Sequence, residues 1–143
     1  MRSFAAILGG ILVAWTSVPA FFAPPCFHFE PAVASISGTL VRKTYPGPPN
    51  YEDIKTGDRP ETGWYLRLAE PICLVGTPGD ELNSEDEAGV NAVQLVLTHN
   101  EYKTHARLVG KKVTATGTFF RSYTGHHHTP VLLTVTRLEL ADK

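Results

Sequence analysis

The sequence shows no excess of either charge sign, since its 143 residues contain 13 Lys and Arg against 14 Asp and Glu. Non-specific nucleic-acid binding needs a basic surface, so this balance argues against a nucleic-acid partner. Charged residues make up 19% of the chain and hydrophobic residues 43%, which argues against disorder, a collagen and a coiled coil. We therefore expect a globular protein, and the length is that of one domain.

Only one apolar run is long enough to concern a membrane, and it lies at the N-terminus. Arg2 precedes an apolar stretch over residues 4–13, and small residues end the segment at Ala20. This pattern predicts a secretory signal peptide over residues 1–20. An uncleaved anchor is the alternative, but fewer than about 18 uninterrupted apolar residues precede Pro19, which disfavours it.

The sequence contains only two cysteines, Cys26 and Cys73, and both lie in the expected mature chain, residues 21–143. Export would place them in an oxidising compartment, where an isolated pair predicts a disulfide. Their wide separation lacks the close spacing of a C-x-x-C redox or metal site. We therefore expect a periplasmic or secreted single domain with one disulfide and no membrane span after signal removal.

Alternating hydrophobic and polar residues predict a mainly β chain. Gly38, inside the first strand, suggests a bulge or a sharp bend. The acidic segment 76–91 is expected to be a solvated connection. The five expected strands cover residues 34–44, 63–73, 92–97, 111–121 and 131–140.

One helix is expected between the third and fourth strands. Thr98 and Glu101 form a capping box at its start, and Gly110 is placed to end it in a left-handed conformation. Its position makes the chain resemble the OB-fold, a partly open five-stranded Greek-key barrel. A small sandwich or an SH3-like barrel is the competing architecture. The expected buried face of the helix consists of Tyr102, Ala106 and Val109.

Three segments carry a further resemblance: CFHFEP (26–31), SGTLVRKTYPGPPNYEDIKTGDRPETGWYLRL (37–68) and TGHHHTPVLLTV (124–135). Together they resemble a family of uncharacterised secreted bacterial domains, and TGHHHTPV is the most specific stretch. The resemblance covers nearly all of the expected mature chain. It implies export and the extent of the domain, and it implies no activity.

Two loops hold the residues best suited to ligand binding. In OB-folds the loops after strands one and four border the ligand-binding face, and here these are residues 45–62 and 122–130. Aromatic rings with a few polar groups suit a small polar ligand, an envelope glycan or a protein partner. The alternative is that the prolines and aromatic rings only pack a long loop. The predicted ligand-binding residues are Tyr45, Tyr51, Asp53, Trp64, Tyr123, His126, His127, His128 and Thr129.

The three consecutive histidines raise a second possibility, a transition-metal site. In an extended backbone His126 and His128 point the same way and His127 opposes them. Two imidazoles on one face can bind Zn²⁺, Cu²⁺ or Ni²⁺, and a firm site needs a third ligand. A metal-binding protein is therefore the alternative to a binding module. The candidates for the third ligand are His28, Asp53 and Glu61.

Catalysis has the weakest basis in the sequence. The serines Ser35, Ser37 and Ser122 lie in strands or turns without a nucleophile-elbow pattern. A small metal-dependent hydrolase would need three firm ligands and an open position, which the sequence does not make evident. We therefore expect a binding module and assign no catalytic residue.

Overall fold

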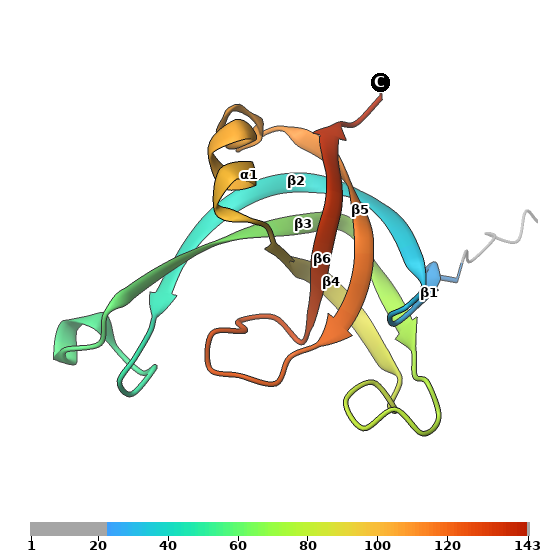
Figure 1. Cartoon of the computed structure of the whole chain (residues 1–143), viewed down its shortest axis with the longest axis horizontal. Coiled ribbons are helices and arrows are strands. Elements are labelled where there is room, and N and C mark those ends of the chain that lie inside the picture. Colours follow the sequence, from blue (N-terminus) through green and yellow to red (C-terminus); the bar gives the residue numbers. More distant parts are fainter. Residues whose placement is uncertain (1–22, 143) are drawn as a thin grey trace, which may run out of the picture.

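A computed structural model describes residues 23–142 of the chain. The expected signal peptide, residues 1–20, lies outside the described residues and stays a prediction. The described part contains six strands, one α-helix and two 3-10 turns (Figure 1). The strands are β1 (Cys26–His28), β2 (Val33–Pro46), β3 (Pro60–Val75), β4 (Glu87–Val96), β5 (Lys112–Arg121) and β6 (Val131–Leu140).

The strands form one mixed sheet in the order β1-β3-β2-β5-β6-β4. An additional pairing of β3 with β4 closes a ring of hydrogen-bonded strands. The β1–β3 and β4–β6 pairs are parallel, and the other pairs are antiparallel. The mainly β prediction is confirmed, but the described chain has six strands where the sequence predicted five.

The additional strand is β1, which lies along the end of β3. Cys26 stands opposite Cys73 in this parallel pair, and the N–H of Cys73 donates to the Pro25 carbonyl at 3.1 Å. The two cysteines form a disulfide with their Cα atoms 4.4 Å apart, which confirms the predicted pairing. A strand of three residues is too short to show an alternating pattern. Distant partners hold β1 in place, so its own sequence does not reveal it.

The core fills the inside of the ring, as the alternation predicts. In β2, Ile36, Gly38 and Leu40 face inward and are buried. A Cβ atom on Gly38 would lie 2.6 Å from the Arg67 carbonyl oxygen and 2.9 Å from the Leu66 side chain. The glycine is therefore needed for the close approach of β2 to β3.

Strand β4 begins at Glu87, five residues before the predicted start at 92. Its first residues pair with the end of β3 through an irregular ladder, and Gly89 adopts a positive φ of 69° there. Arg121 of β5 fixes this start, since its guanidinium lies 2.6 Å from the Glu87 carboxylate. The acidic connection is therefore shorter than predicted, because its last residues join the sheet.

The predicted helix is split into α1 (His99–Thr104) and the 3-10 turn η2 (Ala106–Leu108). The capping box is confirmed: Thr98 N–H donates to the Glu101 carboxylate at 2.7 Å, and Glu101 N–H donates to the Thr98 hydroxyl. Since the helix tightens into a 3-10 turn, Leu108 is buried and Ala106 is exposed, which corrects the predicted apolar face.

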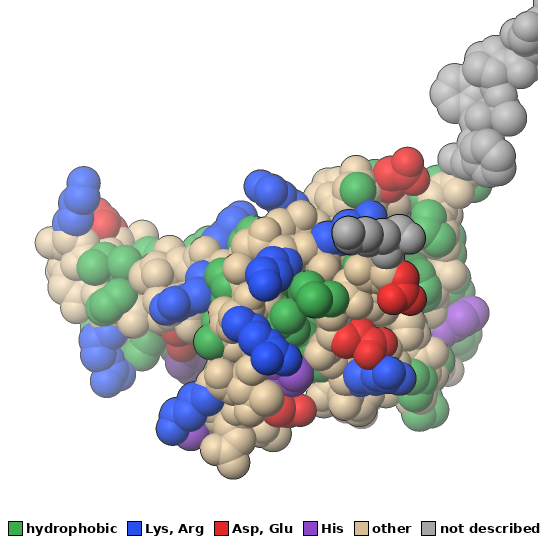
Figure 2. All heavy atoms as spheres, turned by 90° about the horizontal axis from the view of Figure 1, so that it is seen from above, with side chains coloured by type: hydrophobic (Ala, Val, Ile, Leu, Met, Phe, Trp, Pro, Cys, Tyr) green, Lys and Arg blue, Asp and Glu red, His purple; other side chains and the backbone are tan. Residues whose placement is uncertain are grey.

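The outer surface carries most charged side chains. Figure 2 views the molecule from above relative to Figure 1 and shows Lys and Arg side chains across the middle of the face turned to the viewer. Within residues 23–142, no helix has the length and the apolar character needed to cross a membrane.

Candidate functional site

The two predicted loops come together on the outer side of the sheet. One joins β2 to β3 and contains the 3-10 turn η1 (Ile54–Thr56), and the other joins β5 to β6 over residues 122–130. In Figure 1 the β5–β6 loop projects toward the extended end of β2 and β3. The contact between them is made chiefly by Glu61 at the start of β3, with His126 and His128.

Glu61 accepts hydrogen bonds from both of these histidines. The Nδ1 of His126 lies 2.5 Å from its Oε1, and the Nε2 of His128 lies 3.1 Å from its Oε2. An ionised carboxylate only accepts hydrogen bonds, so each of these ring nitrogens is a donor. The Glu61 carboxylate thus joins two residues of the β5–β6 loop to the start of β3, which directly follows the β2–β3 loop.

Tyr51 extends this network from the tip of the first loop. Its hydroxyl lies 3.2 Å from His126 Nε2, and because His126 donates from Nδ1, a neutral ring accepts from the phenol at Nε2. A Cβ atom on Gly125 would lie 3.0 Å from the Tyr51 ring. The absence of a side chain at Gly125 lets the tyrosine ring pack on the second loop.

Aromatic stacking supports the other side of Glu61. The rings of Tyr45 and His128 are stacked, with centroids 4.4 Å apart and planes 9° apart. Tyr65 lies against the edge of Tyr45 and is buried, and its hydroxyl has no hydrogen-bond partner among residues 23–142. Burial is the main cause that raises the pKa of the Tyr65 phenol above its usual value. The cluster therefore rests on a buried, uncharged aromatic layer.

His127 points away from Glu61, as the alternation predicts. Its ring packs against Phe120 and Tyr123, and its Nδ1 accepts a hydrogen bond from the Tyr123 N–H at 3.1 Å. Burial, followed by the charges of His126 and His128, lowers the pKa of His127 below its usual value. His127 therefore holds the turn of the loop, while 65% of Tyr123 stays exposed.

Gln94 of β4 fixes the second loop to the sheet. Its side-chain amide donates to the His126 carbonyl at 3.0 Å and accepts from the His128 N–H at 2.7 Å. Its own N–H donates to the Thr129 hydroxyl, which in turn donates to the Val131 carbonyl. Thr129, a predicted ligand-binding residue, therefore uses its hydroxyl to hold the loop.

Two acidic residues of the first loop have similar structural roles. Asp58 is buried and accepts hydrogen bonds from the N–H groups of Asn50, Glu52 and Asp53. These bonds, that of Glu52 foremost, lower the pKa of Asp58 below its usual value. Asp53 caps η1 by accepting from the Lys55 N–H. Neither carboxylate is directed at the histidines.

The structure corrects two predicted site residues. Trp64 is a core residue, 6% exposed and packed edge-on against Tyr102, because it lies on the inward face of β3. His28 lies opposite Val75 at the far end of β3 from Glu61. It therefore does not belong with the other histidines.

The structure gives no support to the metal alternative. In the part of the chain that the structure describes, no group of three His, Cys, Asp or Glu side chains is arranged to hold a metal ion. His126 and His128 direct their nitrogens at the oxygens of one carboxylate, where hydrogen bonds satisfy them. The proposed set of His126, His128 and His28 is not assembled.

A shallow hollow of about 310 Å³ lies beside the Glu61–His126 pair. Arg59 lines it and forms no ion pair among residues 23–142, and His126 on its wall is hydrogen-bonded to Tyr51. The hollow thus offers a cation, a carboxylate and an imidazole. Its lining residues are Pro48, Arg59, Pro60, Glu61 and His126.

The charge of Glu61 is expected to make the loop contact sensitive to acid. Burial would raise the pKa of Glu61, but the hydrogen bonds from His126 and His128 outweigh it and hold the pKa below its ordinary value of 4.5. A lowered folded pKa stabilises the fold at pH above 4.5, and this stabilisation is lost as the pH falls through the folded value.

We therefore expect Glu61→Gln to melt below the wild-type protein at pH 6, and the difference to shrink as the pH falls toward 3. Melting followed by circular dichroism measures it. Glu52→Gln, on an exposed carboxylate of the same loop, serves as the control and should melt near the wild type. A Glu61→Gln difference that does not change with pH would contradict the prediction.

Sequence reasoning did not find two residues of this site. Gln94 is one polar residue among several on the outer face of β4, and nothing local distinguishes it. Arg59 precedes the proline that starts β3, and its approach to His126 depends on the register of β2 and β3. The pairing of Tyr45 with Glu61 sets that register, and the sequence does not specify it.

Comparison with protein-family models gives a match over part of the chain. A family model described as a domain of unknown function (DUF4431) matches residues 92–139. No curated protein matches the chain. The matched segment includes the three consecutive histidines, residues 126–128, and Gln94, but it excludes Glu61 and the first loop. Over residues 92–139 the chain is therefore similar to an uncharacterised domain family, while its secretion and bacterial origin stay predictions.

Proposed function

We propose that the protein is an exported binding module of the OB-fold type that recognises a small polar ligand. The order of pairing around the ring supports this fold, because β2-β3-β4-β6-β5 follows a five-stranded Greek-key order with the helix between β4 and β5. In such folds the ligand face lies beside the loops that correspond here to β2–β3 and β5–β6.

The observation that carries the proposal is the meeting of these two loops at Glu61. Two histidines and one carboxylate join segments 65 and 67 residues apart in the chain. The hollow beside them, about 310 Å³, lies at the small end of the range for ligand pockets. Its charged groups and the imidazole of His126 suit a small polar molecule or the end unit of an envelope glycan.

Export is part of the proposal and rests on the N-terminal segment of the sequence. The disulfide is compatible with an oxidising compartment. A protein partner is the alternative, because the aromatic side chains of Tyr51 and Tyr123 are exposed on the two loops and aromatic residues are enriched at protein interfaces.

The experiment is a titration of the ¹⁵N-labelled protein with envelope monosaccharides, short glycan fragments and small peptides, followed by NMR. We expect one class to shift resonances of residues 47–61 and 122–130 saturably, and Glu61→Gln to weaken that binding about tenfold. Fluorescence of Trp64 is a poor probe because the ring is buried in the core.

The control is Glu52→Gln, which removes a charge from the same loop outside the hollow and should bind as the wild type. The proposal is wrong if no ligand produces saturable shifts below about 10 mM, or if binding is unchanged in Glu61→Gln. Shifts caused by Zn²⁺, Cu²⁺ or Ni²⁺ that disappear in His126→Ala and His128→Ala would favour the metal alternative instead.

A further inference from the structure

The ladder between β2 and β3 ends at Thr39 and Arg67, although both strands continue beyond this pair. From Val33 to Gly38, β2 pairs only with β5 on its other edge. Within residues 23–142, no strand pairs with residues 68–71 of β3 on the side that faces β2. The gap between residues 33–39 of β2 and 67–72 of β3, hereafter the wedge, thus has two unpaired strand edges.

The wedge accepts extended chain at its wide end. Strand β1 pairs with residues 73–75 on the edge of β3 that β2 occupies over residues 60–67. An unpaired strand edge is a template for a further extended segment. Among residues 23–142, that edge is open between β1 and the last pair of the β2–β3 ladder.

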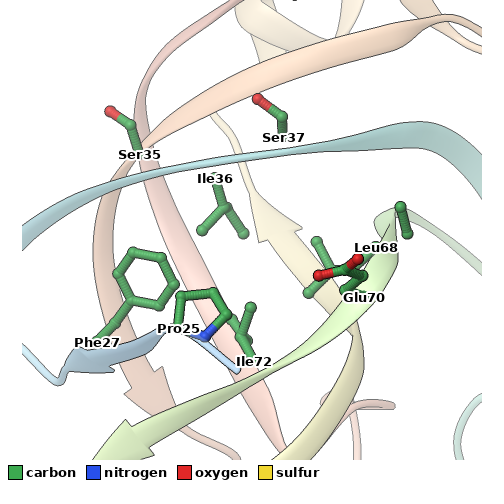
Figure 3. A pocket seen from close by; sticks show the side chains of 9 residues that line it. Pro25, Phe27, Ser35, Ile36, Ser37, Leu68, Glu70 and Ile72 are labelled. Carbon is green, nitrogen blue, oxygen red and sulfur yellow. The ribbon is translucent and has the colours of Figure 1, made fainter. Parts of the chain in front are cut away.

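The middle of the wedge is apolar. Figure 3 shows the side chains of Phe27, Ile36 and Ile72 around a hollow of about 300 Å³, with Leu68 and Pro25 also on its wall. The hydroxyls of Ser35 and Ser37 are hydrogen-bonded to Thr116 and Thr114 of β5, respectively, and so do not fill the hollow. The hollow can therefore receive an apolar side chain.

The narrow end of the wedge is cationic. Thr39 stands opposite Arg67 on one side and opposite Lys112 on the other, so the three side chains lie in a row on one face. Neither cation forms an ion pair with an acid in the described chain. They line a second hollow of about 300 Å³, which shares Ser37, Leu68 and Ala69 with the apolar one.

We propose that the wedge binds the C-terminal end of an extended peptide. The terminal carboxylate lies between Arg67 and Lys112, the last apolar side chain enters the hollow beside Ile36 and Ile72, and the peptide main chain pairs with the open strand edges. Glu70 is the only acidic residue that lines either hollow, and it lines the apolar one. Because Glu70 would repel a second carboxylate in the apolar hollow, the terminal carboxylate of the peptide is favoured at the narrow end.

The test measures fluorescence anisotropy of labelled pentapeptides that end in Leu, Ile, Val or Phe, added to the purified, oxidised protein. We expect saturable binding by the peptides with a free carboxylate and a loss of about tenfold when the carboxylate is amidated. The double variant Arg67→Gln/Lys112→Gln should lose a similar factor. Both side chains are on the surface, so the variant is expected to fold.

The matched control is Lys103→Gln/Arg107→Gln, which removes the same charge from α1 and η2 and should bind as the wild type. Absence of saturable binding at about 1 mM, equal binding of the amidated peptides, or an equal loss in the control would each overturn the proposal. A second ligand, dansylated undecanoic acid, tests an anionic amphiphile in place of a peptide. If this acid binds in a way that depends on Arg67 and Lys112 while the peptides do not bind, the proposal is overturned and the wedge is assigned to an anionic amphiphile.

This site is separate from the loop site at Glu61, and the two proposals are tested separately. Glu61→Gln should bind the pentapeptides with unchanged affinity, because Glu61 lines neither hollow of the wedge. Peptide binding that disappears in Glu61→Gln would place the peptide at the loops instead and overturn the assignment to the wedge.

Discussion

Replacing both cysteines, as Cys26→Ser/Cys73→Ser, is expected to lower the free energy of unfolding by about 4 kcal/mol. The disulfide joins residues 47 apart in sequence, and closing a loop of this length removes roughly that much chain entropy from the unfolded state. For a domain of this size the melting temperature should fall by roughly 15 °C. Urea unfolding of the variant and of the oxidised wild type measures the difference.

The double replacement avoids the unpaired thiol that a single replacement would leave. Chemical reduction of the wild-type protein provides an independent comparison and should produce a similar loss. A loss below about 1 kcal/mol would contradict the prediction. It would mean that the pairing of β1 with β3 and the packing of Phe27 and Phe29 restrict the chain as much as the covalent bond does.

The strands that the sequence predicted correctly are those with local patterns. Over residues 34–40 of β2 and 112–119 of β5 polar side chains alternate with apolar residues or glycine, so burial follows directly from the alternation. The helix start was equally local, because Thr98 and Glu101 satisfy each other's backbone N–H groups within one turn. Features that depend on contacts between residues at most four positions apart could therefore be predicted from the sequence alone.

The features that sequence reasoning missed depend on distant partners. β1 has three residues and is held by Cys73 and by the end of β5, where Glu30 N–H donates to the Phe119 carbonyl at 2.8 Å. The early start of β4 depends on Arg121. No window of sequence contains both partners of these contacts.

The candidate site was predicted in part for the same reason. The expected fold brought the two loops to one end, and His126, His128 and Tyr51 do meet there. Trp64 was predicted to bind ligand because it follows the first loop directly, but its side chain lies inside the ring of strands. The side chain of Trp64 is on the inward face of β3, and the next residue, Tyr65, is on the opposite face and lies under the cluster.

Phe119→Ala is the second change with a large expected effect, a loss of about 4 kcal/mol. The ring is fully buried and packs against Phe27 with centroids 5.7 Å apart, while the main chain of Phe119 pairs with that of Phe29. Removing it therefore leaves a cavity in the core and removes the packing surface of β1. The adjacent Phe120 points outward, where its ring contacts Tyr123 and His127.

Phe120→Ala is therefore a matched control for Phe119→Ala, with an expected loss of about 1 kcal/mol. Urea unfolding followed by the fluorescence of buried Trp64 measures both losses. Because Phe120 supports the turn that presents the histidines, its replacement should instead weaken ligand binding at the loops. Equal losses of stability in the two variants would contradict the inward placement of Phe119. The comparison thus separates the role of β5 in the core from its role in holding the candidate site.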